Sequence, residues 1–248
     1  MIGKELVWHL RSSVLDDIVI PYLWEDKELL RFLNYAEVQA CRRAHLIIDA
    51  TSQMDAGTAG TASTAGQQAL CNVTVKANQA VYTLSSKILQ IRRCQLQSMA
   101  FPLSGPISYN ALDNEWMPDW FGTAGTVSLS DTNGYPDFFL NEPGNQITFV
   151  RAPSMNDTAW LIVSRLPLLP FTLETSPEID EKWHIDLCDW AAHLAFSKND
   201  SETSNPALAK EYEASFTAKF GPLPDAYSER MRKVLSQKSR MRPREFGS

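Results

Sequence analysis

Two pairs of side chains in residues 181–198 have the spacing that a metal site or an enzyme nucleophile needs. His184 and Cys188 lie four positions apart, as do Asp189 and His193. Side chains at this spacing share a helix face, so each pair could hold a metal ion or form a Cys–His nucleophile. A closed zinc site needs converging ligands, however, and these pairs lie on adjoining faces of one short helix. We therefore predict that they pack against the core or a partner, with no metal ion and no catalytic role.

Motifs of the common enzyme and cofactor sites are missing from the sequence. Gly57, Gly60 and Gly66 lie in a run of alanine and threonine that no lysine follows, so they do not form a phosphate-binding loop. No Gly-x-Ser-x-Gly motif marks a hydrolase nucleophile. The four cysteines are widely separated, which disfavours a zinc ribbon or a redox site and favours buried, reduced thiols. We predict a protein that is not an enzyme and that binds no cofactor.

Two tryptophans, Trp116 and Trp120, lie close together in residues 108–120, where we expect a short helix and a loop. Tryptophan rings can stack on a sugar or a base, and they are also common where protein surfaces meet. We interpret this pair as a candidate contact with a neighbouring subunit or with another protein.

The C-terminal residues 229–248 differ in charge from the rest of the chain. Seven basic and two acidic residues give this segment a charge of +5, which leaves −11 for the remainder of a chain whose total is −6. A basic arm on an acidic body suggests that the arm has a role of its own, and we predict a docking role. The basic residues are Arg230, Arg232, Lys233, Lys238, Arg240, Arg242 and Arg244.

The bulk composition is that of a globular protein without a membrane anchor. The chain has 248 residues, of which 44% are hydrophobic and 21% are charged. No apolar run approaches the roughly 20 residues that span a bilayer. The N-terminal residues mix apolar and charged side chains from the start, unlike a signal peptide. We expect a cytosolic product.

Residues 26–48 have the periodicity of a strong amphipathic helix. Asp26 is expected to cap its N-terminus, and residues 4–14 are expected to include a shorter helix. The apolar residues of the longer helix recur at spacings of three and four and share one face: Leu29, Leu33, Ala36, Ala40, Ala44 and Ile47.

Helical patterns return in the last third of the chain. Ser176 and Pro177 resemble an N-cap and a first-turn proline, so we predict a helix that runs through residues 181–198. Asn205-Pro206 begins a second helix in the same way, and Gly221-Pro222 ends it. A last helix is expected over residues 225–238. The first of these helices has an apolar stripe that we expect to pack inside a bundle: Trp183, Leu187, Trp190, Ala191, Leu194 and Ala195.

The middle of the chain has a different character. Residues 55–66 contain no large apolar side chain, so we expect a flexible loop there. After this loop, apolar residues alternate with a period of two. Within residues 88–96, for example, Ile88, Cys94 and Leu96 are expected on one face, and Ile91 on the other. The predicted strands are residues 73–75, 81–84, 88–96, 138–140, 146–150 and 160–165.

The order of helices, strands and helices predicts an α+β fold rather than an alternating α/β fold. The helices at both ends each have a single apolar stripe, so they are expected to pack on one another. We therefore predict a helical bundle formed by residues 1–49 and 173–228, into which an antiparallel β-rich domain of residues 50–172 is inserted. The basic residues 229–248 form a C-terminal arm.

Three stretches of the sequence resemble head-to-tail adaptor proteins of tailed bacteriophages. Residues 24–47, WEDKELLRFLNYAEVQACRRAHLI, resemble their first long helix, and SSKILQIRRCQL (85–96) resembles the strand that follows the loop. Residues 165–221 resemble their closing half, with an Arg-Leu-Pro exit from the last strand, a Trp/His helix and a final amphipathic helix. The three stretches follow one another in the order that the family has.

The resemblance implies a structural virion protein of the neck between capsid and tail, made in the host cytoplasm and active in genome ejection. Such adaptors form closed rings, commonly of twelve copies, between the portal protein and a tail or nozzle protein. Their helical part faces the portal and their β-part faces the tail, so that Trp116 and Trp120 become candidate contacts with the tail or a neighbour. Their C-terminal segment reaches into the portal, and genomic DNA passes through the lumen without sequence-specific binding. No membrane is involved.

Two other classes of function remain open on the sequence alone. A virion protein that binds a carbohydrate or a receptor could use the β-rich domain with Trp116 and Trp120, and its isolated domain would then bind sugar. A hydrolase could use Cys188 with a histidine, and this thiol would then titrate below its ordinary value. Both rank below the adaptor because the sequence has no constellation that would support them.

Overall fold

The computed structural model describes most of the chain in two units. The described residues are 1–52, 69–108, 112, 136–141, 145–198 and 204–234. One compact unit comprises Met1–Ile48 and Arg165–Pro224, and the other includes the described residues among 49–164 and 225–234. The predicted loop at 55–66 lies outside the described residues.

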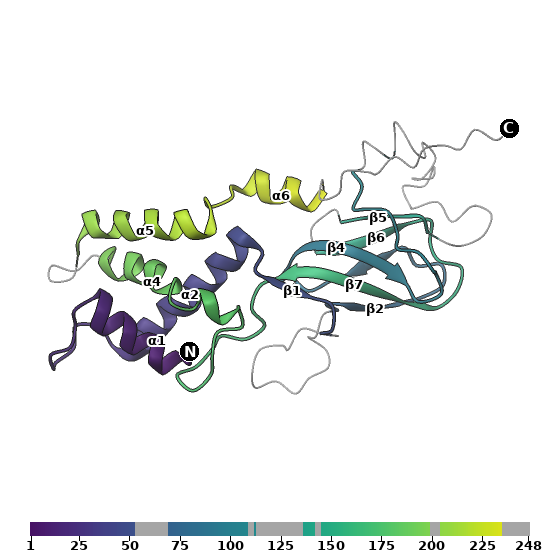
Figure 1. The fold of residues 1–248 in the computed structure, drawn as a ribbon. Helices are drawn as coiled ribbons and strands as arrows, with labels where there is room; N and C mark the ends of the chain where they lie inside the picture. Colours follow the sequence, from purple (N-terminus) through teal and green to yellow (C-terminus); the bar gives the residue numbers. More distant parts are fainter. Residues whose placement is uncertain (53–68, 109–111, 113–135, 142–144, 199–203, 235–248) are drawn as a thin grey trace. The chain divides into compact units, whose positions relative to one another are not determined.

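The structure is α+β with antiparallel strand pairing, and this confirms the predicted class. Most of the described helices belong to the first unit, whereas most of the strands and the last helix belong to the second (Figure 1). The described helices are α1 (Gly3–His9), the π-helix η1 (Leu10–Val14), α2 (Asp26–Ala44), the 3₁₀ helix η4 (Glu181–Trp183), α4 (Leu187–Phe196), α5 (Pro206–Phe220) and α6 (Ala226–Val234). The described strands are β1 (Ile47–Asp49), β2 (Asn72–Val75), β3 (Val81–Thr83), β4 (Ile88–Leu96), β5 (Phe138–Leu140), β6 (Gln146–Val150) and β7 (Asp157–Arg165).

Helix α2 forms where its periodicity predicts, but it ends earlier than expected. His45 adopts the left-handed conformation (φ 51°) and donates its N–H to Cys41 O, which ends the helix at Ala44. Ile47 then lies in β1 rather than on the helix, so its buried side chain follows strand geometry. Asp26 is the first helical residue rather than the cap, because its carboxylate binds Arg11 instead.

The helix predicted through residues 181–198 is interrupted. Ser176 and Pro177 do not begin a helix; the 3₁₀ turn η4 comes first, and α4 starts only at Leu187. The reason is visible in the contacts of the preceding segment, where Glu37 accepts hydrogen bonds from the N–H groups of Glu178 and Ile179. These bonds hold the backbone of Glu178 and Ile179 in a bend that is not helical.

Helix α5 has both predicted ends. The Asn205 side chain accepts a hydrogen bond from the N–H of Leu208 (3.3 Å), with Pro206 in the first turn, and Gly221 (φ 86°) ends the helix. Its aromatic stripe is buried against α4, which packs in turn on α2. Phe216 is fully buried, its ring centroid 4.5 Å from that of Phe220 and 5.1 Å from that of Trp190.

Trp183 and Trp190 are packing residues at the edge of this core, as expected, but both are only partly buried. Arg43 of α2 lies over the Trp190 ring, 4.7 Å from its centroid. The same guanidinium donates hydrogen bonds to Thr217 Oγ1 (3.0 Å) and to Gly221 O (3.1 Å) at the C-terminus of α5. The buried Arg43 thus links α2, α4 and α5.

The irregular residues 166–180 are held by helices rather than by a sheet. Asn34 of α2 exchanges two hydrogen bonds with the backbone of Phe171, at 2.9 Å and 3.1 Å. At the start of α1, the N–H of Gly3 donates to Thr175 O (2.9 Å). A Cβ on Gly3 would lie 2.2 Å from Thr172 O, so the close approach of the two backbones requires glycine.

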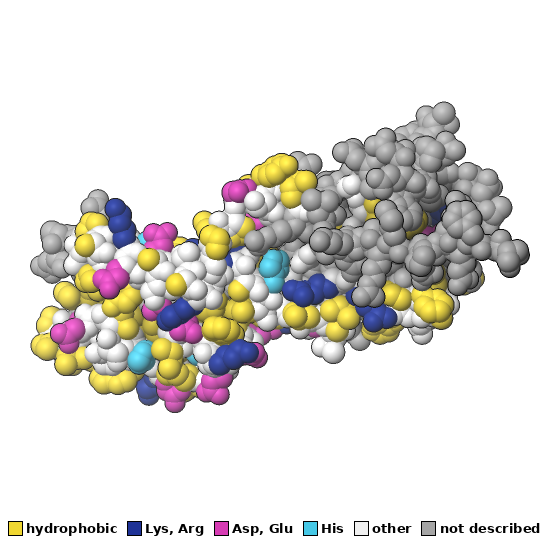
Figure 2. Space-filling model, turned by 45° about the horizontal axis from the view of Figure 1, so that its top comes forward, with side chains coloured by type: hydrophobic (Ala, Val, Ile, Leu, Met, Phe, Trp, Pro, Cys, Tyr) yellow, Lys and Arg dark blue, Asp and Glu magenta, His cyan; other side chains and the backbone are white. Residues whose placement is uncertain are grey.

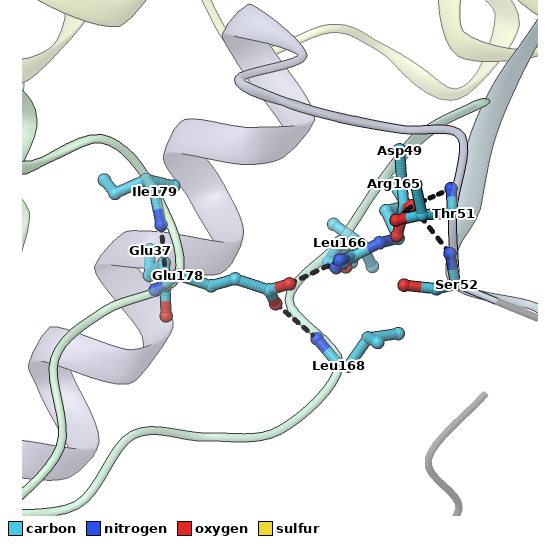
Figure 3. Close-up of polar contacts among 9 residues, drawn as sticks. All are labelled: Glu37, Asp49, Thr51, Ser52, Arg165, Leu166, Leu168, Glu178 and Ile179. Carbon is cyan, nitrogen blue, oxygen red and sulfur yellow. Dashed lines mark hydrogen bonds and ion pairs between the residues drawn. The ribbon is translucent and has the colours of Figure 1, made fainter. Parts of the chain in front are cut away.

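The side chains of Glu37 and Glu178 also hold the backbone of residues 166–180 in place (Figure 3). The buried Glu37 carboxylate accepts from Glu178 N (2.6 Å) and Ile179 N (3.3 Å). Glu178 in turn forms an ion pair with Arg165 and accepts a hydrogen bond from Leu168 N (2.9 Å). Burial raises the pKa of Glu37 to about 7, although the two backbone hydrogen bonds act in the opposite direction.

The strands of the other unit form two sheets. In the first, β7 pairs with β1, β2 and β4, and the pairing with β2 is antiparallel with Asn72 opposite Trp160. In the second, β6 lies between β3 and β5, antiparallel to both. Strands β2 and β3 follow each other around a turn at Asn78 but belong to different sheets. The Tyr82 hydroxyl closes that turn by donating to Gln79 O (2.9 Å).

Strand β4 has the predicted bounds, but not the predicted faces. Ile91 is buried together with Ile88, Cys94 and Leu96. The alternation changes phase at Arg92 and Arg93, which are consecutive and both exposed. A strict period of two would have buried Arg92, and the cost of burying a charge explains why the pattern shifts.

Phe216→Ala is expected to destabilise the helical unit by about 3–5 kcal/mol, because it removes a fully buried ring from the contacts among α2, α4 and α5. Tyr35→Ala is a matched control, since Tyr35 lies on α2 with more than half of its surface exposed. Chemical denaturation of the two variants measures the difference. Equal free energies of unfolding would show that Phe216 is not a core residue.

Glu37→Gln is expected to flatten the dependence of stability on pH. The folded-state pKa of Glu37 is raised from 4.5 to about 7, so folding favours the protonated carboxyl. That contribution is fully present below pH 4.5 and is lost as the pH rises to about 7, a change on the order of 3 kcal/mol. Glutamine does not titrate but keeps an oxygen for the two N–H groups.

The measurement is urea denaturation of both proteins across this pH range. Glu211→Gln on α5 is the control, because Glu211 is exposed. If Glu37→Gln and the unchanged protein lose stability equally as the pH rises, the buried carboxyl does not titrate in this range.

Candidate interaction surfaces

The predicted docking residues are only partly within the described chain. Arg230, Arg232 and Lys233 lie on α6, which contacts β4 of its own unit. The four remaining basic residues lie outside the described residues, as do Trp116 and Trp120. The basic residues outside are Lys238, Arg240, Arg242 and Arg244.

His184 and Cys188 have structural surroundings. His184 is buried, with Nε2 2.9 Å from Ile179 O and Nδ1 3.3 Å from the N-terminal nitrogen of Met1. Burial raises the pKa of the Cys188 thiol to about 12, and Asp189 and Asp186 add to the rise. An activated nucleophile needs a lowered thiol pKa, so this environment disfavours the hydrolase alternative.

Asp189 and His193 join α4 to α5. The Asp189 carboxylate accepts from Ser215 Oγ (2.7 Å) and pairs with Lys219 Nζ (2.9 Å). His193 Nδ1 lies 2.9 Å from Ala209 O at the start of α5. Asp189 and His193 therefore bind a neighbouring helix, whereas His184 binds the Ile179 carbonyl and the N-terminus. Within the described ranges, no group of three or more His, Cys, Asp or Glu side chains could hold a metal ion.

Sequence reasoning missed a loop at residues 18–23, between η1 and α2. Arg11 lies where the two ends of this loop meet; it is 2% exposed and forms an ion pair with the buried Asp17. Arg11 Nη2 also donates to Trp24 O and to Asp26 Oδ1, both at 2.7 Å. Arg11 lies in the π-helix η1 and is buried together with Leu10.

Asp17 fixes the far side of the loop. Its carboxylate accepts hydrogen bonds from the N–H groups of Leu23 (2.9 Å) and Trp24 (3.3 Å). The Arg11 guanidinium lies over the Tyr22 ring, 3.9 Å from the centroid, and Trp24 is buried against Phe196. Both ends of the loop are therefore attached to the core, and the only sequence signal was the apolar run IVIPYL.

The side chains between these anchors face solvent. Ile18, Val19 and Ile20 are 52%, 75% and 77% exposed, and Leu23 is also largely exposed. Figure 2 shows hydrophobic side chains gathered on the surface of the helical unit. Adjacent exposed aliphatic side chains of this kind are typical of protein contact sites.

An open groove of about 730 Å³ runs along the exposed face of α1 and η1. Trp8 lies in it and is 58% exposed. The lining residues are Met1, Lys4, Glu5, Trp8, His9, Ser12 and Ser13. The helical unit thus has an exposed apolar loop and an open groove that contains one tryptophan.

None of the helices in the described part of the chain combines the length and hydropathy of a membrane span. A search of curated protein sequences gave no match. A family model described as SU10 adaptor protein matches residues 9–244, which is nearly the whole chain. The chain belongs to the SU10 adaptor protein family, a family of head–tail adaptors of bacteriophages.

Proposed function

We propose that this chain is one subunit of a closed ring that joins the capsid portal to the tail and surrounds the channel for the genome. The match to the SU10 adaptor family over residues 9–244 is the observation that carries this proposal. The ring contains twelve copies, lies in the neck of the virion and contacts the portal protein on one side and a tail or nozzle protein on the other. DNA passes through it without sequence-specific binding.

In this proposal, the two parts of the chain contact different partners. The helices of residues 1–49 and 173–228 form a bundle that faces the portal, and the β-rich residues 50–172 form an inserted domain that faces the tail. What supports the division is that the described residues form two compact units, one with most of the helices and one with most of the strands. Trp116 and Trp120 supply contacts to the tail or to a neighbouring subunit.

The basic arm of residues 229–248 docks on the portal. Its charge of +5 contrasts with −11 on the rest of the chain. Arginine and lysine add charge-assisted hydrogen bonds when they meet carboxylates of a partner. Contacts of the same residues with DNA phosphates would retain a genome that must pass through the channel, so a protein partner fits the proposal better.

Replacing Lys238, Arg240, Arg242 and Arg244 together by glutamine is expected to weaken binding to the portal by at least tenfold and to reduce its dependence on salt. Four charge-assisted contacts are removed, each worth on the order of 1 kcal/mol or more. Sedimentation with purified portal over a range of salt concentrations measures both effects. A truncation after Gln237 should behave in the same way.

The matched control replaces four basic residues of the β-rich unit, Lys76, Lys87, Arg92 and Arg93. It changes the net charge by the same amount but should leave portal binding unchanged, since it leaves every basic residue of the arm in place. Full affinity and full salt dependence in the arm variant would refute the docking role of the arm.

A further inference from the structure

We propose that Glu37 is a pH-sensitive switch: its protonated form holds the backbone of Glu178 and Ile179 on α2, and its ionisation loosens this attachment. The inference goes beyond the proposed function and does not depend on it, because it concerns how one connection within the subunit is held. It rests on the arrangement of buried and charged groups around this carboxyl.

Glu37 attaches the end of an irregular connection to α2 (Figure 3). Its side chain is 1% exposed, and a single carboxylate oxygen, Oε1, accepts hydrogen bonds from two consecutive N–H groups, those of Glu178 (2.6 Å) and Ile179 (3.3 Å). The connection, residues 166–180, begins where β7 ends at Arg165 and leads to η4. It follows the point at which the chain enters the helical unit. Its attachment therefore fixes the chain just after that point.

The charges next to Glu37 do not balance a negative charge on it. The Arg165 guanidinium already forms an ion pair with Glu178, whose carboxylate is the second acid of this cluster. Cys41 lies one turn further along α2, and burial raises the pKa of its thiol, so this group stays uncharged. Ionisation of Glu37 thus places a second negative charge beside a pair that is already neutral, inside the protein.

The balance of these effects determines which form of Glu37 the attached state prefers. Burial disfavours the ionised carboxylate, the two N–H groups favour it, and the Glu178 charge adds to the effect of burial. Burial is the largest of these effects, and the pKa of Glu37 rises from 4.5 to about 7. In a detached state the carboxyl is hydrated and its pKa returns towards 4.5. Detachment therefore becomes easier as the pH rises from 4.5 to about 7.

A second attachment of the same connection has no charge to lose. Asn34, three residues before Glu37 on α2, exchanges hydrogen bonds of 2.9 Å and 3.1 Å with the backbone of Phe171. Because a side-chain amide does not titrate in this range, this attachment keeps its strength at every pH. The switch therefore loosens the end of the connection at Glu178 and Ile179 and leaves Phe171 in place.

Hydrogen exchange of single amides, followed by NMR, tests the switch. After correction for the intrinsic exchange rate, the protection of the Glu178 and Ile179 amides is expected to fall on the order of a hundredfold as the pH rises from 4.5 to above 7. The Phe171 amide should keep its protection. Constant protection at Glu178 and Ile179 would overturn the proposal. An equal loss at all three amides would also overturn it, because the whole unit would then be opening.

Two variants identify the titrating group, since His184 also binds this end of the connection, with Nε2 2.9 Å from Ile179 O. Glu37→Gln should make the protection of the Glu178 and Ile179 amides independent of pH. Glu174→Gln is the matched control, because it removes an exposed carboxyl from the same connection and should leave the change of protection intact. If the full change persists in Glu37→Gln, another group such as His184 is responsible and the proposal is wrong.

A direct titration needs no variant, so it applies even if Glu37→Gln does not fold. The NMR signal of the Glu37 side-chain carboxyl carbon is followed with pH in the unchanged protein. A midpoint near 7 is the expected result, and a midpoint near 4.5 would contradict the proposal. The portal takes no part in either measurement, so the adaptor function and the switch stand or fall separately.

Discussion

The helical unit depends on α2 because both the apolar and the polar side chains of this helix are needed for packing. Leu29, Leu33, Ala36 and Ala40 are fully buried in the core that α2 shares with α4. Its polar side chains Asn34 and Glu37 satisfy the backbone of residues 166–180, and Arg43 satisfies the end of α5. One helix therefore organises neighbours that are more than 100 positions away in the chain.

Buried polar side chains also fix the conformation of the exposed apolar loop at residues 18–23. Arg11 and Asp17 use buried charge to hold a loop whose own side chains make few internal contacts. A buried ion pair of this kind contributes little net stability, but it fixes one conformation of the backbone around it. Asp189, one of the possible catalytic residues, instead joins α4 to α5 through Ser215 and Lys219.

Periodicity and capping residues made much of the fold predictable. The Asn205 cap, the Gly221 stop and the stripe of α2 act locally, so the sequence alone reveals them. The start of α4 was mispredicted because Glu37, 141 positions from Glu178, determines the backbone there. The apolar loop was missed for a related reason, since its shape depends on Arg11, which looks like an ordinary surface residue in the sequence. Contacts between distant residues decided each of these features.

The central claim is that this chain forms a ring that joins a portal, and direct imaging tests it most simply. Electron microscopy of the purified protein mixed with its portal would reveal the number of copies and their position. The account predicts a closed ring that is coaxial with the portal, with the helical unit of each subunit against it. Separate particles at all concentrations, or a ring that meets the portal through the β-rich unit, would contradict the account.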